Sequence, residues 1–157
     1  MSGSKQTPGV IAPPPIIVIG VVAFGYGLGR LWPFELTGLD PTVRVCVGGG
    51  LFIMATVLAV SALAVMRSAG TPPEPWKPTI HIVSSGPFKY TRNPIYVAML
   101  LVFTGIGMFM GSAWLLLCIP VLFLLLHFGV VVREEAYLTG RFGEEYLAYM
   151  RRVRRWF

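Results

Sequence analysis

Long apolar runs with few charges dominate the chain. The run Val45–Met66 is long enough to cross a bilayer, and Pro15–Leu31 reaches roughly 25 Å as a helix, near the lower limit for a span. The stretch Pro94–Val132 contains no charged residue and would be roughly 58 Å long as one helix, about twice the hydrocarbon thickness of a membrane. We therefore predict a helical hairpin that turns at Gly111-Ser112.

The pattern predicts an all-α, polytopic membrane protein that forms a single domain over residues 1–157. We expect spans at about 15–31, 45–66, 95–110 and 113–132, a cytoplasmic or re-entrant loop at 67–94, and an amphipathic C-terminal helix within a cytoplasmic tail at 133–157. Pro120 is expected to kink the last span. Small residues should allow close helix packing at Gly25 with Gly29, at Gly48–Gly50 and at Gly107 with Gly111.

Composition agrees with a membrane protein. Hydrophobic residues make up 55% of the 157 residues and charged residues 13%, about half the charged share of an ordinary soluble domain. The net charge of +6 does not indicate nucleic acid, because four of the 13 basic residues fall in the last seven positions. A basic cluster beside a membrane helix favours contact with anionic lipid headgroups. The two cysteines, Cys46 and Cys118, lie in apolar runs and imply no disulfide framework.

Charge distribution also predicts the orientation of the spans. Four spans put the N-terminus, the 67–94 loop and the tail on one side, which then holds eleven basic residues, whereas the other side holds Arg30 and Arg44. The positive-inside rule makes the richer side, which includes Lys5, cytoplasmic. Tryptophans fall near the predicted interfaces, as in an aromatic belt: Trp32, Trp76, Trp114 and Trp156.

A polar segment, Gly86 to Tyr96, precedes the third predicted span. Asn93 at the N-cap and Pro94 at the first helical position form a strong helix-start signal. Such a start directs backbone N–H groups and a partial positive charge toward the interface beside Arg92, which suits a carboxylate or a phosphate. The alternative is that Asn93 only caps the helix while Arg92 extends to the headgroups. Local chemistry leaves both interpretations open.

A second polar segment begins at Arg133, where the last predicted span ends. Glu134 and Glu135 are adjacent carboxylates at a predicted helix C-terminus, where the dipole disfavours them. Arg133, Arg92 or a cationic ligand are candidates to compensate their charge. His127 lies on the same helical face as Glu134 and is interpreted as a buried histidine with its hydrogen bonds satisfied.

Aromatic residues follow in the tail at helical spacing. Tyr146 and Tyr149 share one face of a helix, which Leu138 and Phe142 extend. The face belongs either to a functional site or to an interfacial helix with its aromatic side in the membrane.

Together, the two segments resemble the isoprenylcysteine carboxyl methyltransferase and phospholipid methyltransferase group of membrane enzymes. Members carry Gly-Pro-Tyr-Arg-Tyr-x-Arg-His-Pro-x-Tyr before a helical hairpin and Glu-Glu-x-x-Leu-x-x-x-Phe-Gly-x-x-Tyr-x-x-Tyr after it. The match covers about half the chain, residues 82–153. Departures are Asn93 for a histidine, Phe88 for a tyrosine, Arg154 for a proline, and His81 one position away from a related histidine. Asparagine at this position is a variant of the bacterial relatives, so the expected fold stands, but a role that needs an imidazole there does not follow. The expected location is the bacterial inner membrane, with both termini cytoplasmic.

The resemblance implies an S-adenosylmethionine cofactor, with S-adenosylhomocysteine as its product and no metal. Arginine, a helix start, carboxylates and tyrosines suit the carboxylate, ammonium and sulfonium of this molecule. By resemblance, Glu134, Glu135 and Arg133 are the candidate catalytic residues. The candidate cofactor-binding residues are His81, Val83, Gly86, Pro87, Tyr90, Arg92, Asn93, Pro94, Tyr96, Glu134, Glu135 and Tyr146.

The expected acceptor is lipophilic and enters from the inner leaflet: a phospholipid amine, or a prenylated or small lipophilic thiol or carboxylate. One alternative is an NADPH-dependent membrane reductase of the steroid-reductase type, which has a comparable Asn-Pro-x-Tyr stretch, although the Glu-Glu and Phe-Gly-x-x-Tyr segment argues against it. Another is a non-catalytic transporter or scaffold of four helices. That interpretation predicts a charged residue in the interior of the spans, where the sequence has none, because Arg30 lies at the end of the first span.

Overall fold

The computed structural model describes residues 8–74 and 77–156, so Lys5 and Trp76 lie outside the described residues. Within these ranges the fold is all-helical, as predicted, and its only paired extended backbone is an isolated bridge between Glu35 and Ser112. The elements are α1 (Pro14–Leu31), α2 (Pro41–Ser68), the short 3-10 helix η1 (Gly86–Lys89), α3 (Pro94–Met110), α4 (Ala113–Leu117), α5 (Ile119–Leu126), the π-helical turn η2 (His127–Val131), α6 (Val132–Phe142) and α7 (Glu144–Arg152).

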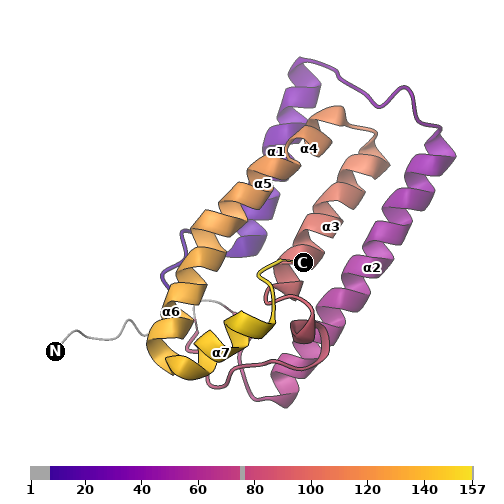
Figure 1. Cartoon of the computed structure of the whole chain (residues 1–157). Helices are drawn as coiled ribbons and strands as arrows, with labels where there is room; N and C mark the ends of the chain where they lie inside the picture. Colours follow the sequence, from indigo (N-terminus) through magenta and orange to yellow (C-terminus); the bar gives the residue numbers. More distant parts are fainter. Residues whose placement is uncertain (1–7, 75–76, 157) are drawn as a thin grey trace.

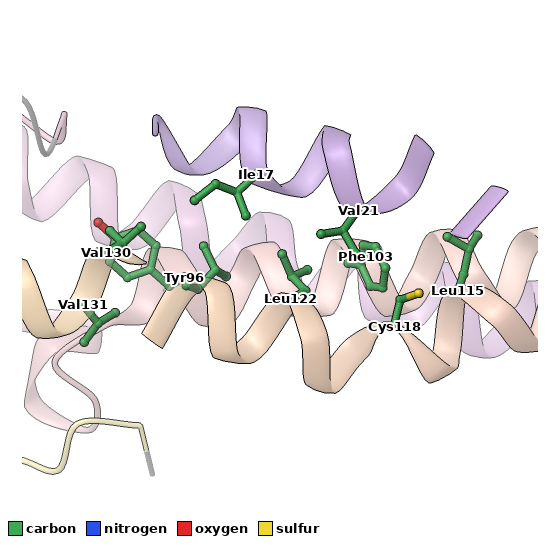
Figure 2. Packing of buried hydrophobic residues seen from close by; sticks show 10 residues of the cluster. Ile17, Val21, Tyr96, Phe103, Leu115, Cys118, Leu122, Val130 and Val131 are labelled. Carbon is green, nitrogen blue, oxygen red and sulfur yellow. The ribbon is translucent and has the colours of Figure 1, made fainter. Parts of the chain in front are cut away.

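Helix α3 occupies the centre of the bundle. It packs along α2 on one side and against α1, α4 and α5 on the other (Figure 1). The core between these helices consists of apolar side chains; Figure 2 shows Ile17 and Val21 of α1 near Phe103 of α3 and Leu122 of α5. The loop after α1 and the α3–α4 turn close one end, while the loop before α3, α6, α7 and the C-terminal residues lie at the other (Figure 1).

Three helical stretches are long and apolar enough to cross a membrane. They are α1, α2 and the nearly continuous run Ala113–Phe142. Helix α3 is also apolar but shorter, with 17 residues. Large apolar side chains such as Ile19, Ile53 and Val57 are exposed on α1 and α2, where lipid can cover them. Length, composition and exposed surface together indicate an integral membrane protein.

The predicted hairpin turn is confirmed. Gly111 ends α3 in the left-handed region with φ of 61°, a conformation that glycine adopts without a steric penalty. Ser112 then caps α4 by accepting a hydrogen bond from the Leu115 N–H. The α1–α2 loop is attached to this turn, because Leu36 N–H donates to Gly111 O at 2.8 Å and Trp114 Nε1 donates to Trp32 O at 2.6 Å.

The last predicted span differs from the observed helix. Helix α4 ends at Leu117 and α5 begins at Ile119, so the helix is interrupted immediately before Pro120, where a kink was predicted. The predicted end at Val132 is wrong, because the helical run continues through η2 and α6 to Phe142. Glu134 and Glu135 therefore lie within the helix and not at its C-terminus. Each of these charged side chains has a partner inside the protein: Gly9 O for Arg133, Tyr96 for Glu134, and Arg92 and Arg155 for Glu135.

The predicted amphipathic C-terminal helix is two helices. Gly143, with φ of 55°, separates α6 from α7 and reverses the direction of the chain. Helix α7 lies at the same end of the bundle as the loop before α3 (Figure 1), and its Tyr149 contacts Phe88 of η1.

Helices α2 and α3 cross closely at two glycines. A Cβ atom on Gly48 would lie 3.0 Å from the Phe109 ring, and one on Gly105 would lie 3.0 Å from the Phe52 ring. Each position also faces the other glycine's carbonyl oxygen at 3.3 Å. The neighbouring Gly49 has no atom within 4 Å of such a Cβ. Of the predicted glycine run, only Gly48 is therefore restricted by packing on α3.

This crossing makes a prediction about stability in detergent. Gly48→Leu should separate α2 from α3 and lower the free energy of unfolding by about 1–3 kcal/mol, the usual cost of overpacking. Gly49→Leu is the matched control and should leave the thermal unfolding midpoint near that of the unmodified protein. Equal midpoints for the two variants would show that the glycine crossing does not hold the helices together.

Candidate active site

A cavity lies at the end of the bundle that carries α6 and α7. Its volume is about 330 Å³, within the range of small-molecule sites. It is bounded by the end of α2, the loop that follows, the start of α3, and the inner faces of α6 and α7. Its charged and polar lining residues are Thr71, Glu74, Thr79, His81, Arg92, Asn93, Tyr96, Glu134, Glu135, Tyr146 and Tyr149, and the remainder is apolar.

The guanidinium of Arg92 is buried at this cavity. Its side chain is only 8% exposed, and Nη1 lies 3.2 Å from Glu135 Oε1. The orientation does not form a hydrogen bond, so Nε and Nη1 are buried donors that lack an acceptor among the described residues. The suggestion that Arg92 extends to lipid headgroups is therefore wrong. Buried donors without acceptors are costly, and bound water or a ligand with acceptor atoms can satisfy them.

Glu135 is the acceptor for a second arginine. Arg155 donates from Nε to both carboxylate oxygens, at 3.1 and 3.0 Å, and from Nη2 to Oε2 at 2.6 Å. This hydrogen-bonded pair raises the pKa of Arg155 above its ordinary value. Glu135 thus lies between two cations, which compensates the cost of burying its charge.

Glu134 has different surroundings from its neighbour. Tyr96 donates from its hydroxyl to Glu134 Oε2 at 2.8 Å, linking α3 to α6. Within residues 8–74 and 77–156, no lysine or arginine lies within salt-bridge distance of Glu134. Of these two adjacent glutamates, one is therefore paired with arginines and the other accepts a hydrogen bond from a phenol.

The two tyrosines of α7 face inward. Tyr146 and Tyr149 are each 4% exposed and line the cavity, so this face does not lie in the membrane. The Tyr149 hydroxyl donates to Phe88 O at 2.8 Å. Burial raises the pKa of Tyr149 to about 12 and also raises that of Tyr146, so both phenols stay protonated at neutral pH.

Asn93 occupies the predicted N-cap position but its side chain does not cap the helix. Its Nδ2 group donates to Arg155 O at 2.8 Å, and Thr91 Oγ1 donates to the same oxygen at 3.2 Å. Arg92 N–H donates to Arg154 O at 3.0 Å. The start of α3 is thus attached to residues 153–156, which we call the C-terminal strap.

The structure brings most of the candidate site residues together, though not all of them. Gly86, Pro87, Tyr90 and Arg133 do not line the cavity. A Cβ on Gly86 would contact Val65, which explains a glycine there, while Tyr90 is 79% exposed. Arg133 points away and donates to Gly9 O at 3.2 Å. The candidates that do line it are His81, Val83, Arg92, Asn93, Pro94, Tyr96, Glu134, Glu135 and Tyr146.

Sequence reasoning missed Arg155 as a site residue. It belongs to a run of four arginines, which spacing alone assigns to lipid headgroups, and only the extended backbone at Val153 directs it inward. Tyr149 was signalled by its shared face with Tyr146. His127 is not at the cavity; its Nδ1 accepts from Trp156 Nε1 at 3.2 Å, which confirms the prediction of a satisfied histidine.

Comparison with known proteins adds the family. The family model for phospholipid methyltransferase matches residues 43–145. An uncharacterized protein from Haemophilus influenzae is 32% identical over 62 residues, which are 40% of this chain and 98% of that protein. No solved structure matches the chain. Because the matched segment exceeds half of the chain and includes α3, the hairpin and the Glu134-Glu135 pair, the chain belongs to the phospholipid methyltransferase family.

Proposed function

We propose that this protein binds S-adenosylmethionine in the cavity and methylates a lipophilic acceptor at the cytoplasmic face of the membrane. The observation that carries the proposal is the meeting of Arg92 from the first motif with Glu134 and Glu135 from the second around one cavity. Family membership supports methyl transfer as the reaction.

The chemistry of the lining fits the donor. Arg92 has buried donors without acceptors, as a ligand carboxylate requires. Glu134 offers a carboxylate with no cation at salt-bridge distance in the described part of the chain, which suits an ammonium or a sulfonium. The buried tyrosines supply aromatic faces and hydroxyl groups nearby. Oppositely charged groups of the donor would thus meet opposite charges of the protein.

When bound, S-adenosylmethionine would supply an electrophilic methyl group on sulfur, and no metal is needed. The protein would hold the acceptor in line with that group and exclude water. A base is required only if the acceptor carries a proton. Glu134 is proposed for this role in preference to Glu135, because its hydrogen-bond partner is the Tyr96 hydroxyl, whereas Glu135 is engaged by Arg92 and Arg155. Arg133 is given no catalytic role, because it points away from the cavity.

The acceptor is proposed to be a phospholipid amine, or a prenylated or small lipophilic thiol or carboxylate. Apolar side chains from three helices line part of the same cavity: Pro14 and Pro15 of α1, Leu63 and Met66 of α2, and Ile95 and Met99 of α3. A site that combines charged groups with an apolar wall at membrane depth fits a lipid that carries a reactive headgroup.

We propose four membrane spans with both termini in the cytoplasm. Helix α3 with 17 residues reaches roughly 25 Å, enough to span in the company of longer helices. Of the basic residues, eleven then lie on the side of the cavity and two on the other. The bacterial inner membrane is the proposed location.

The competing functions receive less support. A steroid-type reductase or a non-catalytic transporter or scaffold would have to account for the family match and for the charged cavity. A reductase would bind NADPH in place of the methyl donor, which binding measurements distinguish.

Binding of the donor can be measured directly. Isothermal titration of the detergent-purified protein should give saturable binding of S-adenosylhomocysteine and S-adenosylmethionine, and none of NADPH. Saturable binding of NADPH alone would favour the reductase and overturn the proposal.

Two substitutions test the proposed contacts. Arg92→Gln and Glu134→Gln should each lower the affinity for S-adenosylhomocysteine by about tenfold or more, since each removes a charged partner of the ligand. Both variants should fold, because Glu135 keeps its hydrogen bonds to Arg155. Glu144→Gln is the control, since that side chain is 84% exposed. Affinities that match the control in both variants would show that the ligand binds elsewhere.

The acceptor class can be found with a radiolabelled donor. Incubation of the protein with S-adenosyl[methyl-³H]methionine and total bacterial lipid should transfer label into the organic phase, and Glu134→Gln should reduce it. Label that appears only in water-soluble products would exclude a lipid acceptor.

A further inference from the structure

We propose that Arg155 of the C-terminal strap is a positioning residue for the ligand carboxylate. By taking up the carboxylate of Glu135, it keeps the guanidinium of Arg92 available to the donor. This inference rests on the proposed function and adds the strap to the site, although the strap does not line the cavity.

The two arginines divide their contacts with Glu135 unequally. Arg155 donates hydrogen bonds to both oxygens of Glu135, the shortest at 2.6 Å. Arg92 approaches the same carboxylate at 3.2 Å without forming a hydrogen bond, and its Nε and Nη1 donate to no described atom. Arg92 is therefore held near a counter-charge while its buried donors remain available.

The backbone of the strap fixes this division. The carbonyl of Arg154 accepts from Arg92 N–H, and that of Arg155 accepts from Asn93 and Thr91. Beyond them, Trp156 donates to His127 and packs against Phe123 with ring centroids 4.9 Å apart. These contacts attach the strap to α3 on one side and to α5 and η2 on the other. The Arg155 side chain then extends to Glu135 of α6.

Loss of Arg155 would change the partner of Glu135. A carboxylate that is 8% exposed needs a cation, and Arg92 would be the arginine remaining at salt-bridge distance. At present Glu135 accepts its hydrogen bonds from Arg155. Without Arg155, it would accept hydrogen bonds from Arg92 instead. Any ligand carboxylate would have to compete with Glu135 for Arg92. Ligands without a carboxylate would not be affected by this competition.

Two ligands separate this role from a structural one. In detergent, Arg155→Gln should lower the affinity for S-adenosylhomocysteine by about tenfold or more. This is the usual effect of losing a charge-assisted hydrogen bond, here the one between Arg92 and the ligand carboxylate. Binding of 5′-methylthioadenosine, which lacks the amino acid part, should change by less than about twofold in the same titration, because it makes no such bond. The double variant Arg155→Gln/Glu135→Gln should regain affinity for S-adenosylhomocysteine, since an amide does not attract Arg92.

Controls keep the outcomes separate. Arg154→Gln should behave as the unmodified protein, because Arg154 is exposed and its hydrogen bond with Arg92 N–H uses the backbone carbonyl. If Arg155→Gln does not fold, Arg155→Lys retains a cation and should show a smaller loss with the same ligand selectivity. Equal loss for both ligands, unchanged affinity for S-adenosylhomocysteine, or no recovery in the double variant would overturn the inference while the proposed function stands. Absence of S-adenosylhomocysteine binding by the unmodified protein would overturn both.

Discussion

The buried carboxylate of Glu135 is the constraint on which the polar end of the molecule depends. An ionised carboxylate removed from water costs several kcal/mol unless cations and hydrogen-bond donors surround it. Here the cations come from segments far apart in the sequence, Arg92 before α3 and Arg155 after α7, and Arg155 also donates the hydrogen bonds. Satisfying this one charge therefore requires the loop, α6 and the strap to meet. A polar cluster that needs all its members selects one arrangement of these segments.

The apolar part of the bundle provides the rigid base for this cluster. Helix α3 is enclosed by the other helices, and its Phe103 is fully buried in a core shared with α1 and α5. Helix α2 packs along α3, and near its end Leu63 and Met66 form part of the apolar wall of the cavity. The apolar wall and the charged groups of the cavity thus come from different segments. The long apolar helices supply the wall, and the loop before α3 and the C-terminal helices supply the charged side chains.

The sequence predicted the apolar architecture well because uncharged runs have few possible structures in a membrane. The turn at Gly111 and the start of α3 at Pro94 follow from local chemistry in the same way. The end of the last helix did not follow from local chemistry. The charged triplet Arg133-Glu134-Glu135 ends the apolar run, but the helix continues because these side chains have partners inside the protein. The motif residues of the site were found by resemblance, but their contacts were not. Arg155 and Arg154 are identical in type and adjacent in sequence, and only the path of the strap decides that one is paired inside and the other exposed.

The adjacent glutamates of α6, Glu134 and Glu135, have the same carboxylate group but different surroundings. Consecutive residues on a helix point about 100° apart, so Glu134 and Glu135 meet different neighbours although their Cα atoms are close. Glu135 turns toward Arg92 and Arg155 and becomes a fixed counter-ion. Glu134 turns toward Tyr96 of α3, whose hydroxyl donates a single hydrogen bond without cancelling the charge. A carboxylate with the partners of Glu134 can still attract a further cation, whereas that of Glu135 already has two arginines beside it. The pair therefore permits stability and reactivity to be assigned to separate residues, and the helix periodicity keeps them apart.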